Sequence, residues 1–209
     1  MRVLVACEFS GTVSKAFRDR GLEAWSCDLL QTEGDPRFHI VGDAVSIAWG
    51  FPWDLMIAHP PCTHTAVSGA RHFEAKKADG RQQMALGFIK ALWNAPIAHK
   101  ALEQPVSISG DAIGRKADQV VQPWQFGHGE TKATCFWLHN LPALVPTRVV
   151  EGREPRIHKM PPSADRWKER SRTFAGVADA MADQWSKALQ NPIGNLLEPV
   201  FHDEEYARG

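Results

Sequence analysis

The sequence predicts an α/β protein in which a mostly parallel sheet carries helices on both faces. Short apolar runs alternate with amphipathic stretches, a glycine-bearing turn separates the first run from the first helix, and polar residues follow the apolar runs. A strand, a turn, a helix and a second strand form a βαβ unit, which favours a parallel sheet. The 209 residues suit one domain. We expect that domain over residues 1–190 and a C-terminal tail over 191–209.

The first half of the chain supplies four expected strands. Each is a short apolar run bounded by glycine, proline or charged residues, and they fall at 3–7, 23–28, 38–41 and 54–58. Helical spacing from Val13 to Arg20 separates the first two runs, and Gly21 follows the basic last turn as a C-cap. The fourth run stops at two prolines, because prolines cannot continue a central ladder.

The second half contains longer helical patterns. The clearest spacing covers residues 81–94 and is closed by Pro96. The expected elements are a loop at 63–80, a helix at 81–94, a strand ending near residue 103, helix and loop at 106–124, a strand at 134–138, an irregular proline-rich stretch at 142–162 and a helix at 174–189.

Composition excludes several classes of protein. The 24 Lys and Arg residues balance 24 Asp and Glu, which argues against a generally basic DNA-coating protein, and a hydrophobic content of 44% excludes wholesale disorder. No apolar run approaches the roughly 20 residues of a membrane span, and the N-terminal apolar stretch is too short for a secretory signal. The four cysteines form no CxxC pair and are expected to be free thiols. We expect a soluble cytoplasmic protein.

Polar residues collect where the expected strands end. They are Glu8 to Gly11, Asp28, Asp43, residues 59–62 and Glu103 with Gln104. In an open parallel sheet, ligands bind beyond the carboxyl ends of the strands. The sequence therefore predicts a binding or catalytic site at this edge of the sheet.

The first three of these positions each have two interpretations. Gly11 either forms an ordinary turn or lets a ligand approach backbone N–H groups at a helix start. Asp28 either caps a turn or accepts the ribose hydroxyls of a nucleoside-type cofactor, and Asp43 either forms a turn or contacts an adenine amino group. Neither GxGxxG nor GxxxxGK[ST] occurs, so the nucleotide sites that those patterns form are unsupported.

Cys62 is the sharpest candidate for a reactive group. Two prolines place it rigidly just past a strand end, as a nucleophile needs, and His59, His64, Arg71 and His72 are possible sources of positive charge. The alternative is a buried, inert thiol. The HxxCxH spacing of His59, Cys62 and His64 matches no zinc pattern, so no metal is expected.

Glu103 is the expected partner of Cys62. The chain between them is long enough for one loop and one helix, which would place the two side chains on adjacent strands. If burial raises its pKa, this carboxyl group would serve as a proton donor. The alternative is an exposed glutamate ahead of a proline.

These residues, in this order, resemble the cytosine C5-methyltransferase family. The matching segments are the FxGxG-like turn at 9–11, the acidic residues Asp28 and Asp43, the Pro-Cys motif at 61–63, the Glu-Asn-Val-like motif at 103–105, the FGxPQxRxR-like segment at 126–134 and the helix after 170–173. The chain is most similar to the short methylase-like proteins that phages and prophages encode, over roughly residues 1–190. The ordered set, rather than any one motif, carries the resemblance.

The resemblance implies a Rossmann-like S-adenosylmethionine-dependent methyltransferase fold and transfer of a methyl group to C5 of cytosine in DNA. Cys62 would attack C6 of the ring, with Glu103 and Lys132 as further catalytic residues. The implied cofactor-binding residues, for S-adenosyl-L-methionine, are Phe9, Ser10, Gly11, Asp28, Leu29, Asp43 and Pro60. The implied substrate-binding residues are Gln104, Thr134, Arg170 and Arg172.

The chain departs from the family pattern in its motifs and in its length. Gln104 replaces the family Asn, and Lys132 and Thr134 stand where the family has arginines. Residues 140–172 form a short basic insert in place of a large target-recognition domain, so we expect low sequence specificity. The basic side chains are either phosphate contacts or a solvated surface: Arg148, Arg153, Arg156, Lys159, Arg166, Lys168, Arg170 and Arg172.

Other functions stay open at this point. The substrate would be duplex DNA, single-stranded DNA or a free pyrimidine nucleotide modified by the same chemistry. A catalytically degenerate methylase fold would act only as a binding protein. A thiol hydrolase would need a His and an Asn or Asp oriented around Cys62.

Overall fold

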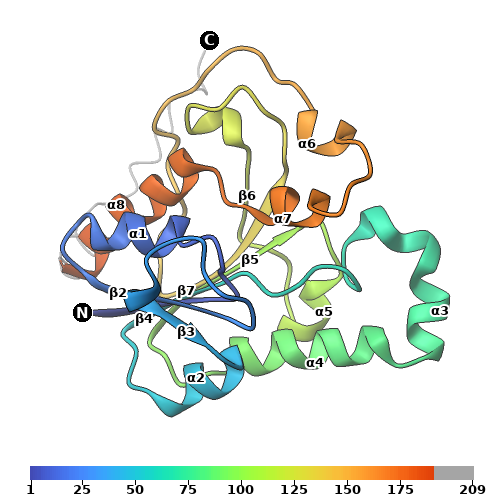
Figure 1. The fold of residues 1–209 in the computed structure, drawn as a ribbon, viewed down its shortest axis with the longest axis horizontal. Coiled ribbons are helices and arrows are strands. Elements are labelled where there is room, and N and C mark those ends of the chain that lie inside the picture. The colour runs from blue at the N-terminus through green and yellow to red at the C-terminus, as the bar shows by residue number, and fades with distance from the viewer. Residues whose placement is uncertain (191–209) are drawn as a thin grey trace, which may run out of the picture.

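The computed structural model describes residues 1–190, and a seven-stranded sheet forms the centre of the molecule (Figure 1). The strands are β1 (Arg2–Ala6), β2 (Glu23–Asp28), β3 (His39–Val41), β4 (Leu55–Ala58), β5 (His99–Pro105), β6 (Gln119–Val121) and β7 (Thr134–His139). Their order across the sheet is β3-β2-β1-β4-β5-β7-β6. Strands β1 to β5 run parallel, whereas β7 is antiparallel to β5 and β6. This arrangement confirms the mostly parallel sheet that the sequence predicts.

Helices cover both faces of this sheet. They are α1 (Thr12–Arg18), α2 (Ala44–Gly50), α3 (Phe73–Ala78), α4 (Arg81–Trp93), α5 (Ser109–Ile113), α6 (Arg156–Lys159), α7 (Arg166–Ser171) and α8 (Ala175–Gln190). Short 3-10 helices cover Pro36–Phe38, Val67–His72 and Pro123–Gln125. The helices expected over 13–20, 81–94 and 174–189 are confirmed with small shifts of their ends.

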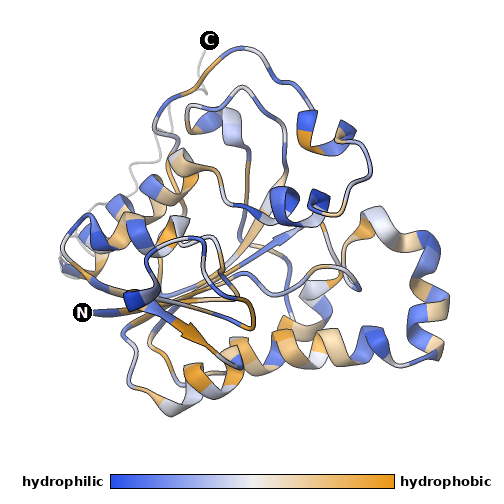
Figure 2. Ribbon diagram, in the orientation of Figure 1, coloured by the Kyte–Doolittle hydropathy of each residue, from blue (hydrophilic) through white to orange (hydrophobic). Residues whose placement is uncertain are grey.

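Alternating side chains of the strands build two separate cores. Val3 and Val5 face α1 and α8 in one cluster, while Leu4 and Ala6 face α2 and α4 in the other. In Figure 2 the apolar residues of α2 and α4 form an orange band along the lower layer of the molecule. Trp185 of α8 is fully buried, and a large apolar side chain buried in this way contributes roughly 1.5–3 kcal/mol.

The prediction of a loop over residues 63–80 is wrong. The chain there forms the 3-10 helix Val67–His72 and then α3. Lys76 of α3 is only 8% exposed, and its Nζ donates a hydrogen bond to the Thr63 carbonyl at 2.7 Å. A lysine that supplies the buried contact of a helix leaves no apolar periodicity in the sequence.

The expectation of helix and loop over 106–124 is wrong in part. Helix α5 lies there, but the stretch also contains β6, which pairs with β7 at the edge of the sheet. Three residues are too few to show the two-residue period of a strand. Helix α2 was not expected either, and the Asp43 carboxylate caps it.

The insert predicted at residues 140–172 contains α6 and α7, and the remainder has no regular structure. Whether it replaces a recognition domain stays a prediction, as do the domain boundaries. The predicted tail at 191–209 lies outside the described residues. No helix in residues 1–190 has the length and apolar character that crossing a bilayer requires.

Candidate active site

The carboxyl ends of β4 and β5 bring the principal candidates together. These strands are parallel neighbours, with Ala58 opposite Leu102, so the chain leaving β4 passes beside Glu103 of β5. His59 follows β4 directly, and its Nδ1 lies 3.0 Å from Oε2 of Glu103. The two side chains are 9% and 14% exposed. The expected placement of Glu103 on the strand next to the one preceding Cys62 is confirmed.

The loop of residues 59–66, here called the cysteine loop, is fixed from two directions. The Cys62 carbonyl accepts hydrogen bonds from the backbone N–H groups of Thr65 and Ala66 at 3.1 and 2.9 Å. The buried amide of Gln104 donates to the Pro60 carbonyl and accepts from the Thr65 hydroxyl at 3.1 Å. Strand β5 therefore anchors the loop on both sides of the cysteine. The substrate contact expected for Gln104 stays a prediction.

The charges around Cys62 come from three other parts of the chain. Burial raises the pKa of the Cys62 thiol above its ordinary value and the Glu103 carboxylate raises it further, while Lys132 and Arg170 act in the opposite direction. Lys132 precedes β7, and Arg170 belongs to α7. The structure thus brings together the three predicted catalytic residues and one of the two predicted substrate arginines. In the free protein at neutral pH, the thiol keeps its proton.

Glu103 is ionised in the free protein, although its side chain is largely buried. Burial by itself raises the pKa of its carboxyl group, but the hydrogen bond from His59 and the positive charges of His59 and Lys132 outweigh burial. The pKa therefore lies below its usual range, and the group is a carboxylate in the free protein. The condition set for Glu103 as a proton donor, a pKa raised by burial, is therefore not met in the free protein, because the hydrogen bond from His59 lies outside what the sequence reveals.

Lys132, Thr134 and Arg172 form a chain of contacts beside this centre. Lys132 Nζ donates to the Arg172 carbonyl at 3.0 Å, and the Thr134 hydroxyl donates to the Lys132 carbonyl at 3.1 Å. The Arg172 guanidinium pairs with Glu33 at 2.5 Å and with Glu169 at 3.2 Å. Glu103 and Lys132 both line a hollow of about 10 Å³, which is the space that one water needs.

Asp28 and Asp43 meet at the ends of β2 and β3, beside Cys7. Burial and the neighbouring Asp28 charge raise the pKa of the Cys7 thiol, whose backbone has a φ of 60°, a region that non-glycine residues rarely occupy. Asp28 Oδ1 accepts from the Leu30 N–H at 3.0 Å. Asp43 Oδ2 accepts from the N–H and hydroxyl of Ser46 at 2.8 and 2.7 Å. The turn and cap interpretations are thus confirmed, and each carboxylate has a second oxygen beyond these bonds.

The glycine turn leads into N–H groups that already have partners within the protein. Gly11 has a φ of 70°, and a Cβ there would lie 3.1 Å from the Gly34 Cα. The buried Glu8 carboxylate accepts the N–H groups of Val13 and Ser14 at 2.6 and 3.1 Å. In this structure the Val13 and Ser14 N–H groups are therefore bonded within the protein, which favours the ordinary-turn interpretation of Gly11. Contacts of the turn with a cofactor stay a prediction.

Helix α7 lies over the glycine turn. The rings of Phe9 and Trp167 are 5.9 Å apart between centroids, and the Arg172 guanidinium lies 5.8 Å from the Phe9 ring. Leu29, which follows Asp28, is 77% exposed, whereas Pro60 is buried. Of the cofactor residues that the resemblance implies, Asp28, Leu29 and Asp43 thus lie at the ends of two neighbouring strands.

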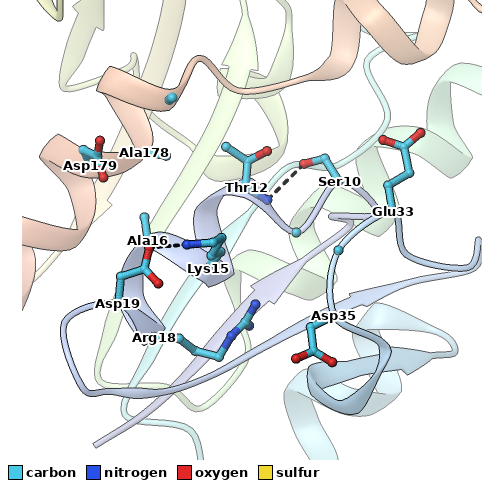
Figure 3. Close-up of a pocket in the computed structure, with 13 residues that line it drawn as sticks. Ser10, Thr12, Lys15, Ala16, Arg18, Asp19, Glu33, Asp35, Ala178 and Asp179 are labelled. Carbon is cyan, nitrogen blue, oxygen red and sulfur yellow. Dashed lines mark hydrogen bonds and ion pairs between the residues drawn. The ribbon is translucent and has the colours of Figure 1, made fainter.

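A larger hollow, of about 690 Å³, lies apart from Cys62 (Figure 3). Figure 3 shows that α1, the chain near Glu33 and the start of α8 line it. Ser10 and Gly11 are the predicted site residues that it includes. The lining is Ser10, Gly11, Thr12, Lys15, Ala16, Arg18, Asp19, Glu33, Gly34, Asp35, Ala175, Ala178 and Asp179. It belongs to the outer side of the glycine turn and not to the cysteine loop.

The segment at 126–134 anchors the neighbouring helices, a role that the sequence did not reveal. His128 Nε2 accepts the Gly176 N–H at 2.9 Å near the start of α8. The buried Glu130 carboxylate accepts from Arg156 at 2.9 Å and from the Ile157 N–H at 3.2 Å. The one signal of this anchoring role in the sequence was Glu130, a polar residue where the family pattern has Gln.

Within residues 1–190, no three His, Cys, Asp or Glu side chains are grouped to hold a metal ion.

Comparisons with known proteins support the fold. No family model and no curated protein matches the chain. A solved structure similar to this chain is described as a candidate DNA modification methyltransferase encoded within a prophage of E. coli. The two share 16% identity and a TM-score of 0.50, over 72% of this chain and 52% of that one. This chain thus spans about half the length of that protein. The match confirms the Rossmann-like methyltransferase fold expected from the sequence.

Proposed function

We propose that this protein transfers a methyl group from S-adenosylmethionine to C5 of cytosine in DNA, through a covalent bond between Cys62 and C6. The convergence of Cys62, Glu103 and Lys132 beyond neighbouring strand ends carries the proposal. A thiol, a carboxyl group and a cation are the groups that this chemistry requires. The solved structure of similar fold, described as a candidate DNA modification methyltransferase, adds support for the reaction class.

The thiol makes an unreactive ring position reactive. The Cys62 thiolate forms a bond to C6 while Glu103 gives a proton to N3, which removes the negative charge that builds on the ring. C5 then takes up the methyl group, which the sulfonium of the bound cofactor supplies. A water accepts the C5 proton, the C6–S bond breaks to restore the thiolate, and N3 returns its proton to Glu103.

The resting protonation states fit this sequence of steps. The free protein holds a Cys62 thiol and a Glu103 carboxylate. The reactive state holds a Cys62 thiolate and a Glu103 carboxylic acid. It therefore binds as many protons as the free protein, with one proton on Glu103 instead of Cys62. A ring nitrogen against Glu103 favours the protonated carboxyl group, and neutral Glu103 no longer raises the pKa of Cys62. Substrate binding therefore activates the nucleophile.

The cofactor fits the described residues in part. The second oxygen of Asp28 would accept ribose hydroxyls, and exposed Leu29 would offer an apolar contact for adenine. Asp43, whose charge acts on Cys7 together with that of Asp28, would contact the adenine amino group. The first N–H groups of α1 are bonded to Glu8. We therefore propose that Asp28, Leu29 and Asp43 hold the nucleoside part of S-adenosylmethionine.

The basic insert is divided between internal contacts and candidate phosphate contacts. Arg156 pairs with Glu130, Arg172 pairs with Glu33, and the Arg153 guanidinium lies 3.8 Å from the Trp124 ring. The candidate phosphate contacts are the other basic side chains of the insert, which form no ion pair among residues 1–190: Arg148, Lys159, Arg166, Lys168 and Arg170. A handful of such contacts gives weak, salt-sensitive binding with low sequence specificity.

The test is a labelling assay. Purified protein is incubated with methyl-labelled S-adenosylmethionine and, separately, with duplex DNA, single-stranded DNA and dCMP. We expect label on C5 of cytosine in DNA, no label with Cys62→Ser, and normal labelling with Cys135→Ser. Cys135 is a matched control because it is buried in the neighbouring strand β7.

Each alternative predicts a different result. Label on dCMP alone would make the protein a nucleotide-modifying enzyme. Cofactor binding without transfer to any acceptor would favour a degenerate fold that acts as a binding protein. Equal labelling by Cys62→Ser would remove Cys62 as the nucleophile.

A further inference from the structure

His59 is a buried side chain that the reaction steps leave without a role. Its ring is 9% exposed, and Nδ1 lies 3.0 Å from Oε2 of Glu103. The other ring nitrogen, Nε2, is buried and has no hydrogen-bond partner among the described residues. Among the described residues, the His59 ring thus makes its polar contact with Glu103 through Nδ1.

The backbone around His59 holds the ring in place. The His59 N–H donates to the Ala6 carbonyl at 2.9 Å, which extends the β1–β4 ladder by one residue. Pro60 follows and restricts the conformation of the residue before it. The imidazole therefore reaches Glu103 from a rigid position rather than from a mobile loop.

The direction of the hydrogen bond follows from the chemistry of the two groups. An ionised carboxylate only accepts hydrogen bonds, so Nδ1 carries the hydrogen and donates it to Oε2. Oε1 of Glu103 is left to hold the proton that the reaction needs. A donor to one oxygen stabilises the carboxylate that forms when the other oxygen releases its proton.

Resting on the proposed function, we propose that His59 is a positioning residue that orients the Glu103 carboxyl group and stabilises the carboxylate left after proton transfer to cytosine N3. In this step the Oε1–H bond breaks and the N3–H bond forms. His59 keeps its own proton at Nδ1 throughout, and the proton returns to Oε1 when the product is released.

Several charged or titratable groups face Glu103 besides His59. Lys132 precedes β7, Cys62 lies in the cysteine loop, and Cys135 lies in β7 itself. When the His59 donor is lost, the burial of Glu103, the neighbouring Cys62 and the charge of Lys132 stay unchanged. The pKa of Glu103 should therefore rise in a variant that lacks the donor.

The test measures the Glu103 carboxyl group directly. Carbon-13 NMR of carboxyl-labelled glutamate, assigned with Glu103→Gln, gives its pKa in the wild type, His59→Leu and His59→Asn. We expect a rise of roughly 1–2 pH units in His59→Leu, the size of a lost hydrogen bond to a charged group. His59→Asn keeps an N–H near the position of Nδ1 and should show a smaller rise. The control is His99→Asn, at the opposite end of β5, with no change.

Activity supplies the second measurement. The acidic limb of kcat/KM against pH should move upward in His59→Leu by the same amount as the pKa, and not in His99→Asn. An unchanged Glu103 pKa in folded His59→Leu overturns the proposal, whatever the protein methylates. A shifted pKa in a protein that methylates no cytosine would instead uphold the contact and reject the proposed function.

Discussion

Replacing Gln104 with alanine should release the cysteine loop from β5. Gln104 is 1% exposed, and its amide makes three hydrogen bonds, to the Pro60 carbonyl, the Thr65 hydroxyl at 3.1 Å and the Ser109 hydroxyl at 3.4 Å. Thr65 and Ser109 are fully buried, so water cannot easily replace the lost partner. The substitution also leaves a cavity, which needs a control of its own.

Gln82→Ala is that control. Gln82 is also buried and also bonds the cysteine loop, but through one hydrogen bond, to the His64 carbonyl at 3.3 Å. The two substitutions remove the same atoms, so their difference reports the two additional hydrogen bonds of Gln104. At about 1 kcal/mol for each bond, Gln104→Ala should cost about 2 kcal/mol more than Gln82→Ala. In a domain of this size, that lowers Tm by about 4–8 °C more.

Thermal unfolding measures the loss of stability. The rate at which a thiol reagent modifies Cys62 measures the release of the cysteine loop. A released loop exposes the cysteine, so the rate should rise in Gln104→Ala more than in Gln82→Ala. Equal melting temperatures and equal Cys62 reactivity in the two variants would refute the anchoring of the loop by β5.

Three further predictions concern packing, thiol ionisation and helix capping. Gly176→Ala should lower the free energy of unfolding by about 1–3 kcal/mol or more, because its Cβ would lie 1.9 Å from the Phe126 carbonyl oxygen. Gly87→Ala in α4 meets no atom within 4 Å and should raise it by about 1 kcal/mol. Chemical denaturation compares the two variants. Glu103→Gln should lower the pKa of Cys62, because it removes a negative charge, and iodoacetamide should then alkylate Cys62 faster at pH 8; a slower rate would contradict the stated electrostatics. Asp43→Ala should cost about 1 kcal/mol in urea unfolding, and Asp43→Ser should recover most of it as an alternative cap of α2.

Local patterns were sufficient for the parallel part of the sheet. The run at 3–7, the helical spacing after Val13 and the run at 23–28 follow from the alternation of apolar and polar residues, which is visible within a short window. Connections in such folds are short and regular, so the order of elements also predicted a parallel sheet. The placement of polar residues at strand ends followed from the same reasoning.

Elements stabilised by polar contacts were missed. Helix α3 buries Lys76 against the Thr63 carbonyl, and β6 is a three-residue edge strand held by β7. Neither leaves an apolar period in the sequence, because each depends on a partner that lies elsewhere in the chain. Propensity and periodicity describe a segment alone, whereas tertiary contacts decide these cases.

The sequence by itself determined the fold class and the candidates Cys62 and Glu103, since both depend on where apolar runs end. Only the tertiary structure decided the surroundings and the protonation of those residues. It placed His59 against Glu103 and lowered the pKa of a carboxyl group that burial alone would raise. It also placed the Glu8 carboxylate at the start of α1, where it accepts the Val13 N–H. Hydrogen-bond partners and burial depend on how distant segments meet, and the protonation of a buried group is decided by those neighbours.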